Sequence, residues 1–152
     1  MKLSVILWRG VCSSLDDIRQ KDLPTVADVR KCIGLVGQIK KALAPQFEKY
    51  DTLKEQGLKI MTPYTDKLKA IGEAKTDKAE RERQKLVDEA NKALAETNGE
   101  IEELDKLNRE EVVDIEVDGN YRSFFKAHFE TLIRPKFVKA EDVVAIADAF
   151  EI

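Results

Sequence analysis

The stretch that decides the fold is Thr76–Arg109, TDKAERERQKLVDEANKALAETNGEIEELDKLNR. Its composition favours helix, and its apolar side chains recur every three or four residues. The members of this row are Leu86, Ala90, Ala93 or Leu94, Thr97, Ile101 and Leu104. Asn98-Gly99 is a turn signal inside the row, but the apolar phase continues across it, so we predict one helix over residues 76–109. A row this narrow requires a second long helix beside it.

The second helix is predicted over residues 25–56, where Thr25 can cap the first amides and Asp28 favours the positive end of the helix dipole. Its apolar row has the same alternating spacing of three and four. The members are Val26, Val29, Ile33, Val36, Leu43, Phe47 and Tyr50, with Lys40 as the one polar member. Pro45 lies inside this segment, so we expect a kink or break near residues 41–45.

Residues 57–76 join the two predicted helices. Gly57 is expected to end the first helix, and Thr62-Pro63 has the order of a cap followed by a first helical proline. The two long helices are then the arms of an antiparallel hairpin.

Outside the hairpin the periodicity changes. Residues 112–117 alternate apolar and acidic side chains, which predicts a short, half-buried strand. Its predicted partner is a buried strand over residues 3–8. Asn120 can cap a helix over residues 120–134, and five of the ten aromatic residues lie within residues 121–137. A last helix is predicted over residues 139–150. We therefore predict a mainly α (α+β) chain with one domain over residues 1–152, in which the hairpin projects from a small two-stranded sheet and two C-terminal helices.

Composition excludes several classes of protein. Hydrophobic residues make up 43% of the 152 residues and charged residues 36%, which is unlike a disordered or a membrane-embedded chain. The net charge of −3 gives no reason for the whole chain to bind nucleic acid or an anionic membrane. The apolar run at residues 3–8 is too short for a signal peptide, so we expect a cytoplasmic protein. Cys12 and Cys32 lack the spacing of a zinc or redox motif and are expected to be reduced structural thiols.

No enzyme motif is evident, so we expect no enzymatic activity, no cofactor and no small-molecule substrate. His128 is the only histidine and is expected at the boundary of an aromatic helix. Asp114, Glu116 and Asp118 share one face of the predicted strand and could gather a divalent cation, but a solvated polar face has the same pattern. Gly34 and Gly37 are expected to allow close helix packing.

Charge is distributed unevenly along the chain. Residues 77–111 carry 12 acidic and 7 basic residues, a net charge of −5, whereas residues 119–139 carry a net +4. Aromatic residues alternate with the basic residues of the second segment, as they do in proteins that bind single-stranded nucleic acid. The residues that would contact nucleic acid are Arg122, Lys126, Arg134, Lys136 and Lys139. Helical spacing of the aromatic residues favours a core role for them instead.

The order of elements resembles small bacteriophage-encoded helical proteins of unknown function. The resemblance begins at the predicted N-terminal strand and rests on five further segments, which are Leu23-Pro24, Tyr50–Glu55, Glu103–Leu107, Glu110–Ile115 and Val138–Val143. It implies a phage accessory or assembly protein, located in the host cytoplasm or in the virion, and supplies no catalytic residues.

These observations predict a non-enzymatic interaction or assembly protein that uses an exposed hairpin seam to self-associate or to bind a partner protein. The predicted seam residues are Ile39, Leu43, Phe47, Tyr50, Leu86, Leu94 and Ile101. The alternatives are a nucleic-acid-associated accessory factor that uses the basic C-terminal segment, and an inhibitor of a host defence protein. An intramolecular hairpin and a swapped coiled coil both satisfy the same seam.

Overall fold

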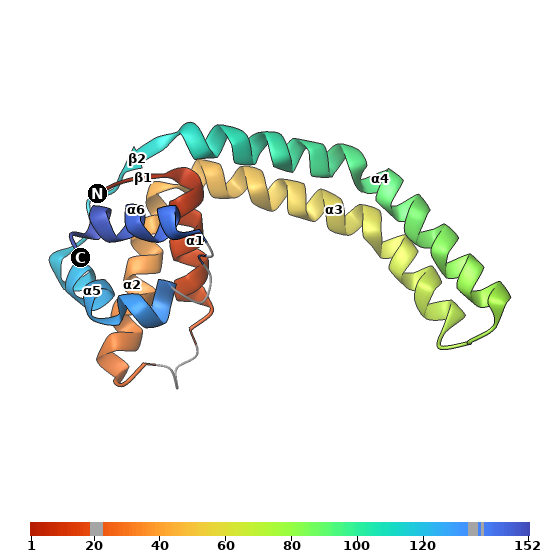
Figure 1. The fold of residues 1–152 in the computed structure, drawn as a ribbon, viewed down its shortest axis with the longest axis horizontal. Coiled ribbons are helices and arrows are strands. Elements are labelled where there is room, and N and C mark those ends of the chain that lie inside the picture. The colour runs from red at the N-terminus through yellow and green to blue at the C-terminus, as the bar shows by residue number, and fades with distance from the viewer. Residues whose placement is uncertain (19–22, 134–136, 138) are drawn as a thin grey trace. The chain divides into compact units, whose positions relative to one another are not determined.

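The computed structural model of the chain describes residues 1–18, 23–133, 137 and 139–152. The fold is mainly α with one small antiparallel sheet, as the sequence predicts (Figure 1). In chain order, the elements of the described residues are β1 (Lys2–Ser4), α1 (Val5–Asp16), α2 (Val26–Ala42), α3 (Ala44–Ile71), α4 (Asp77–Glu110), β2 (Val112–Asp114), α5 (Gly119–Ile133) and α6 (Ala140–Phe150).

The chain divides into two compact units. The core unit comprises Met1–Gln46 and Asp105–Ile152, and the hairpin unit comprises Phe47–Leu104. Our sequence analysis counted one domain over residues 1–152. Residues 47–104 contain most of α3 and α4 as one continuous segment, while the residues on either side of that segment share a separate apolar core.

The core unit is organised around three large aromatic side chains that are fully buried. Trp8, Phe125 and Phe150 come from α1, α5 and α6, and burying each stabilises the fold by roughly 1.5–3 kcal/mol. The ring centroids of Phe125 and Phe150 lie 4.0 Å apart, and those of Trp8 and Phe150 lie 5.9 Å apart. The Trp8 indole also donates a hydrogen bond of 3.0 Å to the Val113 carbonyl, which ties α1 to β2. The aromatic C-terminal helix is therefore part of this core, as predicted.

The small sheet joins the two sequence segments of the core unit, because β1 lies in the first and β2 in the second. β1 and β2 are antiparallel, with Leu3 opposite Val113, and they lie side by side in Figure 1. This confirms the predicted partnership, but both strands are shorter than predicted, because β2 ends at Asp114 rather than at residue 117. Burial still alternates beyond the strand, since Ile115 and Val117 are buried while Glu116 is exposed.

The predicted strand over residues 3–8 is wrong beyond Ser4. The Ser4 side chain caps a helix there by accepting a hydrogen bond from the Leu7 amide, and α1 continues to Asp16. The buried residues of α1 have helical spacing: Val5, Trp8, Val11, Cys12 and Leu15. A short apolar run fits a strand and a buried helix equally well, and the period becomes evident only when Val11 and Leu15 are included.

The predicted helix over residues 25–56 is two helices that meet at Leu43. The break lies inside the predicted interval of 41–45, and Pro45 lies in the first turn of α3, where its missing N–H costs no internal helical bond. At the other end of α2, the Thr25 hydroxyl accepts a hydrogen bond of 3.1 Å from the Asp28 amide, which confirms the predicted cap. The first arm of the hairpin is therefore α3 alone, and α2 belongs to the core unit.

The predicted helix end at Gly57 and the predicted helix start at Thr62-Pro63 are both wrong. α3 continues through Gly57 and through Pro63 to Ile71. A Cβ added at Gly57 would lie 3.9 Å from a Leu94 methyl group and 4.0 Å from the Thr97 methyl group, so this glycine faces α4. Packing against the second arm overrides the local signals that would end the helix.

α4 and the two C-terminal helices follow the predictions closely. α4 is continuous across Asn98-Gly99, as its apolar phase indicated. α5 begins at Gly119, and the residue that caps it is Asp118 rather than Asn120, because the Asp118 carboxylate accepts a hydrogen bond of 2.8 Å from the Asn120 amide. The predicted end of this helix at residue 134 lies outside the described residues.

Gly34 of α2 allows the close helix packing that we predicted for it. A Cβ at this position would overlap the Tyr121 side chain of α5. Gly37 has open space around its Cα, so the same prediction is wrong for Gly37.

Candidate functional site: the helical hairpin

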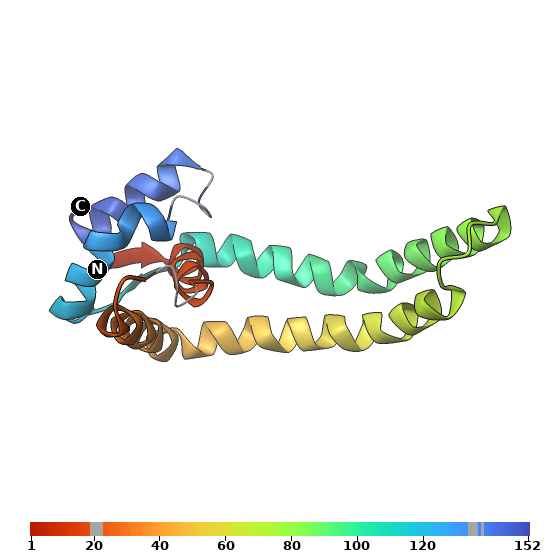
Figure 2. The ribbon, with the colours of Figure 1, turned by 90° about the horizontal axis from the view of Figure 1, so that it is seen from below.

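The hairpin unit consists of α3 and α4 and the loop that joins them, and the two helices lie side by side (Figure 2). We call the row of facing side chains between them the hairpin seam. The contact of Gly57 with Leu94 and Thr97 fixes how the two helices are aligned, with residues before Gly57 on α3 facing residues after Leu94 on α4. An antiparallel pair with this alignment is the arrangement that the apolar spacing predicts.

Few side chains of the seam are fully buried, and most of these are small. Within the hairpin unit the buried residues are Tyr50, Ala79, Ala90 and Thr97. Apart from Tyr50, the large apolar side chains of the seam are only half-buried. They are Phe47, Leu53, Ile60, Met61, Tyr64, Leu68, Ile71, Leu86, Leu94, Ile101 and Leu104. Each helix therefore covers one side of the other and leaves part of the apolar surface in contact with water.

Two further apolar side chains of the hairpin unit are exposed. Leu58 on α3 is 68% exposed and Val87 on α4 is 39% exposed. Sequence analysis did not include them, nor the half-buried residues between Leu58 and Ile71. Their spacing of three and four is the signal that includes them in the row, but Gly57 and Pro63 are typical of helix ends and interrupt the pattern in the sequence.

The predicted seam residues do not all lie in the hairpin unit. Ile39 on α2 and Leu43 at the end of α2 are fully buried in the core unit, so the expectation that they belong to an exposed seam is wrong. The break at Leu43 is the physical reason, because it separates the row on α2 from the row on α3. The other five predicted residues, Phe47, Tyr50, Leu86, Leu94 and Ile101, lie along the hairpin seam.

The loop of the hairpin is closed by specific polar contacts. Gly72 has a φ of +65°, a left-handed conformation that glycine adopts without strain, and it follows the last residue of α3. The Thr76 hydroxyl accepts a hydrogen bond of 3.2 Å from the Ala79 amide and so caps α4. The Arg83 guanidinium donates to the carbonyl oxygens of Gly72 and Ala74. These contacts hold both ends of the loop in place.

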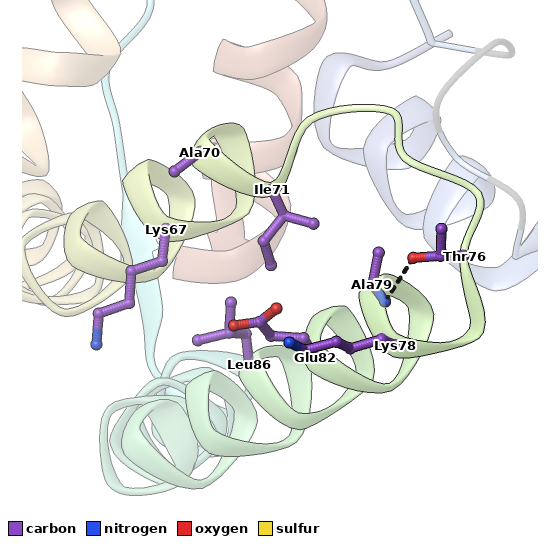
Figure 3. Close-up of a pocket in the computed structure, with 8 residues that line it drawn as sticks. All are labelled: Lys67, Ala70, Ile71, Thr76, Lys78, Ala79, Glu82 and Leu86. Atoms are coloured by element: carbon purple, nitrogen blue, oxygen red, sulfur yellow. Dashed lines mark hydrogen bonds between the residues drawn. The ribbon is translucent and has the colours of Figure 1, made fainter.

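Next to this loop, residues of α3, the loop and α4 line an open pocket of about 520 Å³ (Figure 3). Ile71 of α3 points toward Leu86 of α4 and forms the apolar part of the pocket with it. Lys67, Lys78 and Glu82 supply its charged groups. Sequence analysis singled out only Leu86 among these residues.

The basic residues predicted for nucleic-acid contact are largely engaged within the chain. Lys126 donates a hydrogen bond of 2.9 Å to the Glu151 carbonyl, and Arg122 lies 3.6 Å from the Glu151 carboxylate. Lys139 is exposed and lies 3.9 Å from the Glu141 carboxylate. Arg134 and Lys136 lie outside the described residues. Each of the three described residues thus lies beside an acidic residue of the chain, Arg122 and Lys126 beside Glu151 and Lys139 beside Glu141.

The three acidic side chains considered for a cation have separate surroundings. The Met1 ammonium donates a hydrogen bond of 2.6 Å to Asp114 and lowers the pKa of that carboxyl. Asp118 caps α5, and Glu116 is exposed. In the part of the chain that the structure describes, no group of three histidine, cysteine or acidic residues is arranged to hold a metal ion.

His128 and the two cysteines have the surroundings that the sequence predicts. His128 is half-buried, with its ring centroid 5.0 Å from that of Phe124 and its Nε2 atom 3.9 Å from the Asp28 carboxylate. Cys12 and Cys32 are buried free thiols. Burial raises the pKa of each to about 11, with Asp16 adding to the effect, so both thiols are protonated at neutral pH.

Comparison of the chain with protein-family models, with curated proteins and with solved structures found no match. None of the helices in the described ranges has the length and apolar character needed to cross a membrane.

Proposed function

We propose that this chain is a non-enzymatic interaction or assembly protein that binds a protein partner through the hairpin unit. The observation that carries the proposal is the half-exposed hairpin seam. Eleven large apolar side chains lie along it and remain partly accessible, whereas three of the four fully buried residues are small. Apolar helical surface left in contact with water is typical of sites where a further helix binds.

The exposed side chains Leu58 and Val87 support the proposal that the hairpin unit binds a partner. Each lies next to a half-buried residue of the seam in the sequence, so together they extend the apolar stripe beyond what one antiparallel arm covers. A helix that packed on this stripe would bury Leu58 and Val87 together with the accessible edges of Leu86 and Leu94.

The biological setting that we propose comes from the resemblance to small phage-encoded proteins. An assembly role, in the host cytoplasm or in the virion, fits a chain whose accessible apolar surface lies on a pair of long helices. Inhibition of a host defence protein is the other role compatible with the same surface. Nucleic-acid binding is not favoured, because Arg122 and Lys126 already contact Glu151.

Site-specific photo-crosslinking tests the proposal. A photo-reactive benzoylphenylalanine in place of Leu58 is expected to give one or a few discrete protein adducts in extracts of the native cell, or of the infected host if the chain is viral. The matched control is the same replacement at Val144 of α6, which is 57% exposed and belongs to the core unit. Adducts at Leu58 but not at Val144 support the hairpin unit as the binding surface. Equal labelling at both positions, or none at Leu58, contradicts it.

A further inference from the structure

The hairpin unit has two halves of unequal charge. We call residues 58–92 the tip half, which contains nine basic and seven acidic residues and has a net charge of +2. The base half comprises residues 47–57 and 93–104, with two basic and seven acidic residues and a net charge of −5. Lysines dominate the α3 side of the tip half, and glutamates dominate the α4 side of the base half.

The division between the halves lies at the same level on both helices. Gly57 on α3 faces Leu94 and Thr97 on α4. The boundary between the tip half and the base half therefore falls at nearly the same height on both helices. At 1.5 Å per residue, each half extends for roughly 17–24 Å along the helices. This length exceeds the screening length of about 8 Å at physiological ionic strength, so an approaching protein encounters each half as a separate charge.

We propose that the partner of the hairpin unit is the hairpin unit of a second copy of this chain, bound in antiparallel orientation. The inference rests on the proposed function and names the partner. In this orientation the positive tip half of each copy lies against the negative base half of the other, and both contacts are attractive. A parallel pair would place two base halves of −5 together and two tip halves of +2 together, so both contacts would be repulsive.

The antiparallel pair also accounts for the accessible apolar surface. Both halves carry half-buried seam residues, such as Ile60 and Leu86 in the tip half and Leu53 and Ile101 in the base half. A two-fold arrangement therefore brings apolar stripes together along the whole contact, and the same residues are used on both copies. Four helices then bury the seam that two helices leave half-exposed.

The tip pocket contributes the basic side of this contact. Lys67 and Lys78 lie beside its apolar residues Ile71 and Leu86, within a cavity of about 520 Å³ (Figure 3). In the antiparallel pair this pocket meets the acidic base half of the second copy. Glu96, Glu100 and Glu103 are exposed there and are the natural counterions for the two lysines.

Charge reversal in the full-length chain tests the inference. The tip variant carries Lys67→Glu, Lys69→Glu and Lys78→Glu, and the base variant carries Glu96→Lys, Glu100→Lys and Glu103→Lys. All six side chains are exposed, so the helices are retained. The matched control replaces the same three lysines with arginine, which keeps the charge.

The wild-type chain and the arginine control are expected to sediment as dimers at low salt. Each charge-reversed variant alone is expected to dimerise at least about tenfold more weakly, because like charges then meet at both contacts. An equimolar mixture of the two variants is expected to regain the dimer, since every contact in a mixed pair joins opposite charges. The base variant separates the two orientations, because in a parallel pair its base halves would carry +1 each in place of −5, and it would then dimerise more tightly than the wild type.

A monomeric wild-type chain, or single variants that dimerise like the wild type, would overturn the antiparallel pair. The outcome is separable from failure of the proposed function. If the wild type is monomeric and the Leu58 crosslink still captures another protein in extracts, the hairpin unit binds a different partner and only the second-copy inference is wrong. If purified wild type is monomeric and no adduct forms at Leu58, both proposals are wrong.

Discussion

At the scale of single residues, the two cysteines show how burial in the fold alters the pKa of a thiol, a property that the sequence alone does not reveal. Cys12 on α1 and Cys32 on α2 are almost completely inaccessible, and the Cys32 thiol donates a hydrogen bond to the Leu15 carbonyl. Removing either thiol from water makes its charged form unfavourable. The folded chain therefore holds both protons at pH values where an unfolded chain would release them.

This difference predicts a loss of stability in alkali. The folded pKa of about 11 lies above the ordinary value of 9.0, so the contribution of each thiol is fully present below about pH 9 and is lost as the pH rises toward 11. At pH 10 the loss is on the order of 1 kcal/mol for each thiol. Urea unfolding at pH 8 and at pH 10 measures it. The double variant Cys12→Ala, Cys32→Ala should lose less stability between these two pH values than the wild type, and an identical loss would contradict the assignment.

At the scale of elements, α3 is the case in which local signals and tertiary packing disagree. Gly57 and Pro63 are ordinary helix-ending residues, and both lie inside a helix of 28 residues. The apolar spacing continues through them. Packing against α4 therefore stabilises a continuous helix by more than Gly57 and Pro63 destabilise it. Pro63 has no N–H to donate, so α3 lacks the internal hydrogen bond that would reach the Lys59 carbonyl.

Replacing this proline should therefore stabilise the hairpin unit. Pro63→Ala restores a backbone donor in an exposed position of α3, and the expected gain is about 1–3 kcal/mol. Thermal unfolding followed by circular dichroism measures the gain. The matched control is Thr62→Ala at the preceding exposed position, which removes an exposed methyl group and a hydroxyl that donates to the Leu58 carbonyl and should change stability by less than about 0.7 kcal/mol. A destabilised Pro63→Ala variant would show that the proline is required for the path of α3.

Comparing the predicted elements with those of the structure shows which features the sequence could predict and which it could not. The continuity of α4, the cap at Thr25 and the pairing of β1 with β2 depend on spacing or local chemistry, and all three were predicted. α1 was missed because residues 3–8, which are apolar apart from Ser4, form a run too short to show a distinct period. The assignment of Ile39 and Leu43 to the hairpin failed because a break of one residue at Leu43 redirects the chain while leaving the apolar spacing unchanged. The tip pocket depends on side chains from two helices and had no sequence signal of its own.

At the scale of the whole molecule, the two units differ in how much of their apolar surface is buried. Fully buried aromatic side chains stabilise the core unit, including Trp8, Phe125 and Phe150. In the hairpin unit, Tyr50 is the only large side chain among the described residues that is buried to this degree. Stability is therefore distributed unevenly along the chain.

Hydrogen exchange is expected to reveal this difference. Amides of α3 and α4 within residues 47–104 should exchange with solvent faster than the amides of α1 and α5, because local opening of the hairpin unit exposes less apolar surface. Exchange measured by mass spectrometry on dilute chain, where self-association is minimal, gives the comparison. The amides of α1 and α5 serve as the internal reference. Slower exchange in the hairpin unit than in α1 would contradict the expected order.

The closed loop at Gly72, Ala74 and Arg83 also bears on the order in which the chain folds. The hairpin unit joins residues close together in sequence, whereas the β1–β2 pairing joins Leu3 to Val113. Contacts between near neighbours close small loops and form quickly, and distant ones form slowly. Pulse-labelling hydrogen exchange during refolding should therefore detect protection at the loop-proximal turns of α3 and α4 before protection of β1. The most slowly assembled part of the molecule is then the one that becomes the most stable, while the part that forms first remains the easiest to open.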